Sequence, residues 1–229
     1  MKAAPLAIPV GDGKVSGLLV APPEPRAACV LAHGAGAGMA HPFMEAVAHG
    51  LAERGIATLR YQFPYMQRGS RRVDTPKVAQ AAVRAAVAEA ARRLPGVPLY
   101  AGGKSFGGRM TSQAQAEAPL DGVRGLVFLG FPLHAAGKPA DARGAHLADV
   151  KVPMLFLQGS RDDLASLDLL RPLVKSLGAL ATLAVFEGAD HSFHVPAKSG
   201  RKDAEVMAEV LDALGAWIEK GSDTFSISE

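Results

Sequence analysis

The chain has 229 residues, of which 48% are hydrophobic, so it is long enough and apolar enough to bury the core of one globular domain. Its 25 Lys and Arg residues barely exceed its 22 Asp and Glu residues, and it has no basic tract of the kind that binds nucleic acid. No apolar stretch approaches the length needed to span a bilayer, which argues against a membrane protein.

The single cysteine, Cys29, cannot form an intramolecular disulfide, and it lies in an apolar run where a small hydrophobic residue packs well. The first ten residues are interrupted by Pro5 and Pro9 and lack the continuous apolar segment of a signal peptide. We therefore expect a cytoplasmic protein with a single domain over residues 1–220 and a flexible polar tail over residues 221–229.

The N-terminal part of the sequence predicts an antiparallel β-hairpin. Two apolar runs, at residues 6–10 and 15–20, flank a turn centred on Asp12 and Gly13. Strands and helices then alternate. The predicted strands cover residues 27–32, 56–61, 97–102, 124–129, 152–157 and 181–186, and the predicted helices cover residues 43–53, 75–94, 106–117, 166–177 and 202–219. This alternation predicts an α/β fold with a mostly parallel sheet and helices on both faces.

The most informative motif is Gly-Lys-Ser-Phe-Gly at residues 103–107, which lies between a predicted strand and a predicted helix. A strand-to-helix turn this tight strains the backbone of its central residue and needs small residues two positions away on either side. Gly103 and Gly107 meet that need, and the turn would lift the Ser105 hydroxyl above the edge of the sheet. Ser105 is therefore the predicted nucleophile, with an ordinary helix N-cap as its alternative role.

A serine nucleophile requires an acid and a histidine, which follow it in that order on loops after later strands. Asp162 follows the predicted strand over residues 152–157, and His191 follows the one over residues 181–186. We predict that Asp162 and His191 complete the catalytic set.

Neighbouring residues offer alternatives to these two assignments. Asp163 or Asp190 could replace Asp162 as the acid, and His194 could replace His191 as the base. Sequence neighbours usually point their side chains in different directions, so only one residue of each group is expected to reach the site.

Two glycine-rich stretches do not fit nucleotide-binding motifs. Gly-Gly-Lys-Ser resembles the end of a phosphate-binding loop, but residue 98, where that motif needs its first glycine, is proline. The glycines at 34, 36 and 38 are spaced GxGxG rather than GxGxxG. The histidines also lack metal-ligand spacing, so we expect neither a cofactor nor a metal.

Four segments together resemble the serine α/β-hydrolases, most closely the small dienelactone-hydrolase-like members that lack a large lid. The segments cover residues 31–38, 102–110, 157–163 and 188–193. The resemblance implies the α/β-hydrolase fold and a Ser-His-Asp triad. Dienelactone hydrolases are known for a cysteine nucleophile, whereas this chain has Ser105, so their lactone substrate is not implied.

The resemblance also places an oxyanion hole and a substrate cleft. The amide of Phe106 would be one oxyanion donor, and that of Ala35 the second, with Gly36 as its substitute. Between Phe131 and Val150 there is room for a loop and one short helix, so the site should be open. The predicted walls of an apolar, shallow cleft are Phe63, Pro64, Tyr65, Met66, Phe106, Phe131, Leu133 and Phe193, of which Phe63, Tyr65, Phe131 and Phe193 are the predicted substrate-binding residues.

These features predict a serine hydrolase that cleaves small carboxylic esters through an acyl-enzyme. Thioester or small-peptide hydrolysis, and transfer of the acyl group to an acceptor other than water, would use the same triad. A non-catalytic interaction protein that kept the fold is the remaining alternative. The expected partner is a small-molecule ester, with no nucleic acid or membrane, and the oligomeric state is left open.

Overall fold

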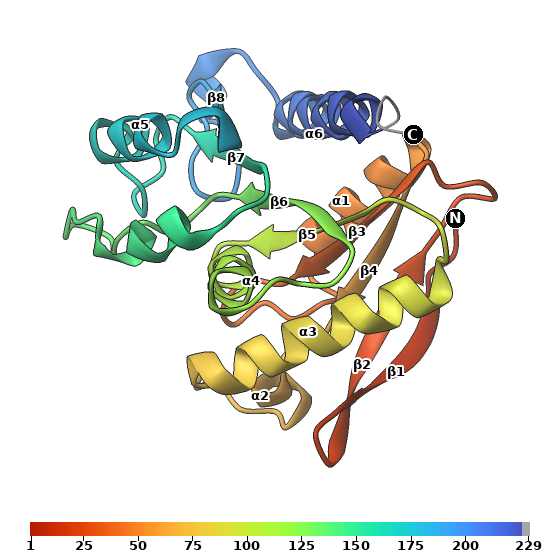
Figure 1. Cartoon of the computed structure of the whole chain (residues 1–229). Coiled ribbons are helices and arrows are strands. Elements are labelled where there is room, and N and C mark those ends of the chain that lie inside the picture. Colours follow the sequence, from red (N-terminus) through yellow and green to blue (C-terminus); the bar gives the residue numbers. More distant parts are fainter. Residues whose placement is uncertain (226–229) are drawn as a thin grey trace.

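The computed structural model describes residues 1–225 and contains one eight-stranded sheet with helices on both faces (Figure 1). The strands are β1 (Ala4–Val10), β2 (Gly13–Val20), β3 (Ala27–Ala32), β4 (Ile56–Tyr61), β5 (Leu99–Lys104), β6 (Val123–Leu129), β7 (Met154–Gly159) and β8 (Ala181–Phe186). The α-helices are α1 (Pro42–Glu53), α2 (Pro64–Gln67), α3 (Pro76–Arg93), α4 (Phe106–Glu117), α5 (Leu167–Ser176) and α6 (Asp203–Phe225), and the 3-10 helices are η1 (Ala142–Asp149), η2 (Gly178–Leu180) and η3 (Ala197–Ser199).

The strand order is β1-β2-β4-β3-β5-β6-β7-β8, and all pairs from β4 to β8 are parallel. The hairpin of β1 and β2 adds antiparallel strands at one side. Its turn is at Gly11 and Asp12, one residue earlier than predicted, because Val10 pairs with Gly13 and Gly11 adopts the positive φ of 55°. The mostly parallel α/β architecture with an N-terminal antiparallel hairpin is confirmed.

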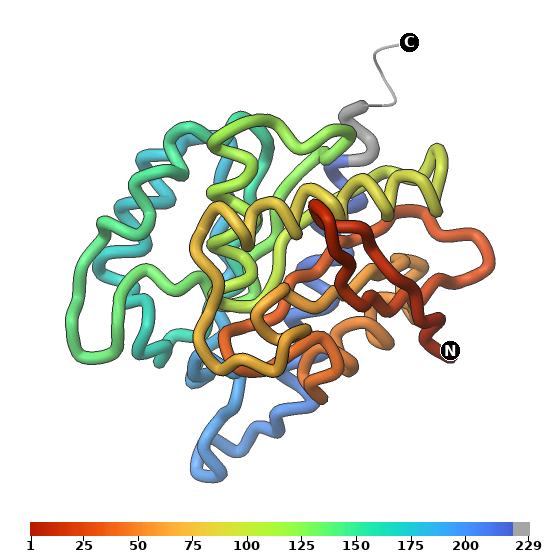
Figure 2. Tube along the Cα trace, turned by 90° about the horizontal axis from the view of Figure 1, so that it is seen from below, coloured from red at the N-terminus to blue at the C-terminus, as the bar shows by residue number. Residues whose placement is uncertain are grey.

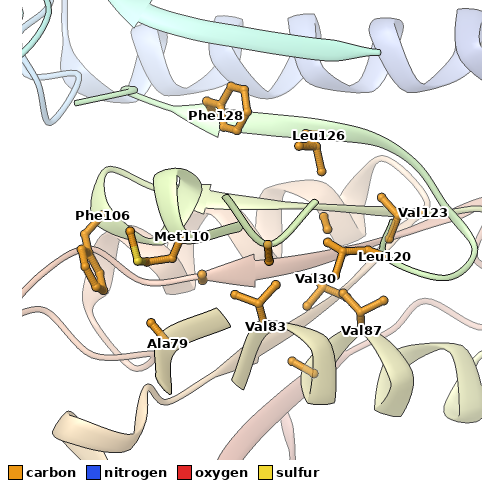
Figure 3. Close-up of a cluster of buried hydrophobic side chains, with 14 of the residues drawn as sticks. Val30, Ala79, Val83, Val87, Phe106, Met110, Leu120, Val123, Leu126 and Phe128 are labelled. Atoms are coloured by element: carbon orange, nitrogen blue, oxygen red, sulfur yellow. The ribbon is translucent and has the colours of Figure 1, made fainter. Parts of the chain in front are cut away.

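Two apolar layers cover the sheet. Helices α1 and α6 bury their apolar residues against one face, and α3, α4 and α5 bury theirs against the other. In the second layer, Val83 and Val87 of α3 face Val30 of β3, with Met110 of α4 beside them (Figure 3). Burying each such side chain contributes about 1.5–3 kcal/mol, so these contacts set how α3 and α4 lie on the sheet.

The carboxyl ends of the parallel strands lie along one edge of the sheet, and their loops bring distant residues together there. Between β6 and β7 the chain forms a loop and the short helix η1, with no large lid. Figure 2 shows this segment, in green, on the opposite side of the molecule from the N-terminal hairpin, in red.

Helix α6 is longer than predicted. It was expected to end near residue 219, but it continues to Phe225 because no proline follows Ile218 to stop it. Residues 221–225 of the predicted flexible tail are therefore helical, and its remaining residues, 226–229, lie outside the described residues. Among residues 1–225, no helix has both the length and the apolar character needed to cross a bilayer.

Candidate active site

Ser105 lies at the turn from β5 to α4 in a strained backbone conformation. Its φ of 50° and ψ of −117° are unfavourable for a residue with a side chain. The turn presses against the end of β3: a Cβ atom on Gly107 would lie 2.5 Å from the carbonyl oxygen of Ala32, and one on Gly103 would collide with the Ala32 backbone. The Ser105 hydroxyl does not cap α4, so the N-cap role is not seen.

This close approach predicts that Gly107→Ala destabilises the fold. The added methyl group meets backbone rather than a movable side chain, so β3 and α4 must separate, and we expect a loss of about 1–3 kcal/mol in the free energy of unfolding. Gly13→Ala is the matched control, because its Cβ would have the Val10 carbonyl oxygen, 3.8 Å away, as its nearest contact. Urea unfolding would measure both, and equal stability of the two variants would contradict a tight turn.

The structure brings Ser105, His191 and Asp162 together from the ends of β5, β8 and β7. The Ser105 Oγ lies 2.8 Å from Nε2 of His191, and Nδ1 of His191 lies 2.6 Å from Oδ2 of Asp162. A carboxylate accepts hydrogen bonds, so Nδ1 carries the proton and Nε2 is free to accept the serine hydroxyl proton. This tautomer is the one in which the imidazole acts as a base toward Ser105.

Three donors hold the buried carboxylate of Asp162. Besides His191, the Leu164 amide donates to Oδ1 at 2.8 Å, and Nε2 of Gln158 donates to Oδ2. The Gln158 amide is oriented by its own acceptor, Oε1, which receives the Phe131 amide at 2.9 Å. Gln158 is fully buried at the end of β7, and sequence reasoning missed it. The feature of the sequence that could have identified Gln158 is a polar residue at the end of an otherwise apolar strand.

The alternative residues point elsewhere. Asp190 accepts hydrogen bonds from the amides of Ser192 and His194, and His194 pairs with Asp203 at the start of α6, 2.8 Å away. The hydrogen bond to Asp203 raises the pKa of His194. Asp163 is exposed and makes no hydrogen bond within the described part of the chain. None of these three side chains is hydrogen-bonded to Ser105 or to the His191 ring.

The loop after β3 presents a main-chain N–H beside the serine. Nε2 of His33 accepts the Phe63 amide at 3.1 Å, so Nδ1 carries the proton and donates to the Gly34 carbonyl at 2.8 Å. Burial lowers the pKa of His33, which keeps the ring neutral. Because a trans peptide is planar, fixing the Gly34 carbonyl also fixes the Ala35 N–H, which points the opposite way.

The amides of Ala35 and Gly36 differ in their partners. Gly36 donates to the phenolic oxygen of Tyr65 at 3.0 Å, so its N–H is already used. Within residues 1–225, neither the Ala35 N–H nor the Phe106 N–H at the start of α4 donates a hydrogen bond. These two amides are the ones available to an oxyanion, and Tyr65 orders the loop that carries one of them.

A pocket of about 510 Å³ opens in front of Ser105. Its walls come from the loop after β3, the start of α1 and the loops after β5, β7 and β8. The lining residues are Gly34, Ala35, Ala37, His41, Phe43, Met44, Lys104, Ser105, Leu164, His191, Ser192, His194 and Asp203. More of the lining surface is apolar than polar, as in most small-molecule sites.

The predicted wall of aromatic residues is wrong. Phe63, Tyr65, Phe131 and Phe193 are all at most 1% exposed, and none occurs among the described residues that line the pocket. Large rings gain most from full burial, and each of the four packs against other rings beneath the site. The ring contacts are Phe63 with His33 and Phe106, Tyr65 with Phe63, Phe131 with Phe128 and Phe156, and Phe193 with Phe43 and Phe186.

A second, more polar hollow of about 770 Å³ adjoins the pocket, and His194 lines both. Asp163, Asp168 and Asp190 line this hollow together with Arg161. The described residues include no group of three or more His, Cys, Asp or Glu that could hold a metal ion.

Comparisons with known proteins agree with this fold. A family model described as an alpha/beta hydrolase domain matches residues 25–219. The structure is similar to a dienelactone hydrolase from Anabaena variabilis, with 22% identity, a TM-score of 0.77, and coverage of 96% of this chain and 97% of the other. The fold is thus that of the α/β-hydrolases, and the predicted resemblance to dienelactone-hydrolase-like members is confirmed.

Two further solved structures share the fold. One is a serine hydrolase without a lid from Xanthomonas campestris, with 21% identity, a TM-score of 0.73, and coverage of 94% of this chain and 95% of the other. The second is Est1E from Butyrivibrio proteoclasticus with ferulic acid bound, at 20% identity, a TM-score of 0.73, and coverage of 93% and 99%. At these identities the likeness establishes the fold.

Proposed function

Because this chain is a hydrolase of the alpha/beta hydrolase family, we propose that it is a serine hydrolase that cleaves small carboxylic esters. The observation that carries the proposal is the hydrogen-bonded series Ser105, His191 and Asp162, with separations of 2.8 and 2.6 Å, beside two unused main-chain amides. A non-catalytic protein would need neither the strained serine nor the unpaired amides.

The proposed reaction begins with attack of the Ser105 Oγ on the ester carbonyl carbon while Nε2 of His191 takes the hydroxyl proton. The carbonyl oxygen becomes an oxyanion and accepts hydrogen bonds from the amides of Ala35 and Phe106. The intermediate then expels the alcohol, which receives the proton from His191. Water attacks the acyl-enzyme in the same way, and the acid leaves with Ser105 restored.

Asp162 supports these steps without exchanging a proton. Its carboxylate keeps the Nδ1 proton in place and stabilises the positive charge that the His191 ring carries after it takes the serine proton. The Leu164 amide and Gln158 hold the carboxylate still while this charge develops.

The pocket supports short acyl groups as the substrate class. Its volume of about 510 Å³ lies in the lower part of the range for small-molecule sites, and its apolar wall includes Phe43, Met44 and Leu164. Each added methylene that fits gains about 0.8 kcal/mol of binding until the wall is reached. The segment between β6 and β7 contains only a loop and the short helix η1, so it forms no lid over a long acyl group.

The test is a series of p-nitrophenyl esters from acetate to palmitate. We expect kcat/KM to rise over the first short acyl groups and then to fall at least about tenfold for the longest. Leu164→Ala should shift the optimum to longer acyl groups, whereas Leu167→Ala should leave it unchanged, because Leu167 lines the second hollow. If the protein hydrolysed none of the esters but did hydrolyse thioesters or anilides, the proposed substrate class would have to change to those compounds.

We also propose that the protein works in a reducing compartment such as the cytoplasm. Cys29 is a free thiol, fully buried in β3, and burial raises its pKa to about 12. A thiol in this state does not form the disulfides that are common in secreted domains, which supports the proposal.

A further inference from the structure

Lys104 immediately precedes Ser105, and its ammonium group ends beside the proposed base. The residue is 9% exposed and lines the pocket. Its Nζ donates a hydrogen bond to the main-chain carbonyl oxygen of His191. The proposed mechanism does not use this group. Burying a cation costs free energy, so its position next to the reacting atoms needs an explanation.

The surroundings of Lys104 are built to hold a cation. Nζ lies 5.6 Å from the centre of the Phe43 ring and 5.9 Å from that of Phe193, within the range of cation–π attraction. A Cβ atom on Gly130 would lie 3.0 Å from Nζ and 3.3 Å from Nδ1 of His191. The ammonium group and the imidazole therefore share the space above Gly130 at the end of β6.

Two nearby carboxylates offset only part of the effect that burial has on the Lys104 ammonium group. Burial lowers its pKa to about 8, while Asp162 after β7 and Asp190 after β8 oppose that shift. His191 is a further titratable neighbour on the loop after β8. The other elements packed against the ammonium group contribute the Phe43 ring from α1 and Gly130 from β6, which carry no charge.

We infer that Lys104 is a positioning residue that holds the main chain of His191, and with it the imidazole, in line with Ser105 for as long as its ammonium group is charged. This inference rests on the proposed function. A hydrogen bond from a charged donor is roughly twice as strong as one from a neutral donor, and attraction to the two rings requires the charge.

The loop that Lys104 holds is itself under strain. Phe193 adopts a φ of 62°, which is unfavourable for a bulky residue, so the turn after His191 persists only under restraint. Loss of the charge removes one restraint from the carbonyl of His191. A shift of the imidazole by about 1 Å costs about 10²-fold in rate.

Stability and activity should respond to pH in opposite directions. The pKa of Lys104 in the folded protein, about 8, is below its ordinary value of 10.5, so unfolding takes up a proton between these pH values. The contribution of Lys104 to the free energy of unfolding therefore rises with pH over that interval. The proposed positioning effect is lost as pH rises through about 8, so loss of the Lys104 charge does not itself lower the stability of the fold where the rate falls.

The experiment measures the second-order rate of labelling of Ser105 by a neutral fluorophosphonate from about pH 6 to about pH 10, for the wild type, Lys104→Met and Lys104→Arg. Lys151→Met is the matched control, because Lys151 also donates to a main-chain carbonyl, that of Ala148, but it lies at the amino end of β7. The free energy of unfolding of each variant is also measured in urea. Rates are compared only among variants whose urea unfolding shows that they are folded.

We expect the wild-type rate to fall as pH rises through about 8. Lys104→Met should be about 10²-fold slower at neutral pH with no such fall, and Lys104→Arg should be faster than Lys104→Met and also lack the fall, because arginine stays charged. Any one of three results would overturn the inference. These are a wild-type rate that does not fall as pH rises, a Lys104→Met variant that reacts as fast as the wild type, and a Lys104→Arg variant that reacts no faster than Lys104→Met. Absence of labelling in the wild type would instead refute the proposed function.

Discussion

Replacing Ser105 with Ala should lower ester turnover by about 10⁴- to 10⁶-fold and abolish labelling by a fluorophosphonate. Among the described residues, the hydroxyl that His191 contacts in front of the pocket is that of Ser105, so its removal should prevent formation of the acyl-enzyme. The fold should persist, because the hydroxyl does not cap α4 and alanine keeps the same Cβ. Intact-protein mass after labelling, together with circular dichroism, measures both.

Ser112→Ala is the matched control. The Ser112 Oγ lies 2.7 Å from Nε2 of His146, so the two serines have similar histidine contacts. Ser112 is fully buried, however, and burial with nearby Arg109 lowers the pKa of His146 to about 4. We expect normal labelling of Ser112→Ala. A label that survives in Ser105→Ala, or that is lost in Ser112→Ala, would place the nucleophile elsewhere.

The second large effect concerns the acid. Asp162→Asn should lower kcat by about 10⁴-fold, because an amide has one acceptor oxygen where the carboxylate has two. The Leu164 amide, Gln158 and His191 all donate to this side chain. An asparagine must turn its own donor toward at least one of them, which disfavours the productive tautomer of His191.

Asp163→Asn is the control for the acid and should change kcat by less than about threefold, since surface substitutions away from the site have small effects. Steady-state kinetics on one short ester suffices, with thermal unfolding to show that both variants are folded. If Asp163→Asn proved the slower of the two, the carboxylate next to His191 would have to be reassigned.

Much of the site is predictable because its geometry is local or follows from topology. The strained turn at Ser105 depends on the glycines two residues away, and these are visible in the sequence. Residues that follow parallel strands meet at the same edge of the sheet, so Asp162 and His191 could be placed near Ser105 from their order alone. The hydrogen bonds among the three agree with that placement.

The aromatic residues show where such reasoning fails. Phe63, Tyr65, Phe131 and Phe193 follow strands or loops that reach the site, and position along the chain made them candidates for its wall. Whether a ring faces a pocket or the core depends on which other rings lie beneath it. That is set by contacts between residues far apart in sequence, such as Phe193 with Phe43.

The buried polar residues were missed for the same reason. In the sequence, Gln158 and Lys104 stand at the ends of apolar strands, and Tyr65 was predicted to bind substrate rather than to order a loop. Their roles depend on partners 4, 87 and 29 residues away, at Asp162, His191 and Gly36. Side-chain periodicity carries no information about such pairings.

The sequence by itself determined the α/β order of elements, the strained turn at Ser105 and the order of nucleophile, acid and base, because these depend on local backbone preference and on the direction of parallel strands. Tertiary structure decided which of two adjacent aspartates meets His191, which amide of the loop after β3 stays unused and which side chains form the pocket. The physical reason is that hydrogen-bond partners and buried surfaces are shared between segments that only the packed fold brings into contact.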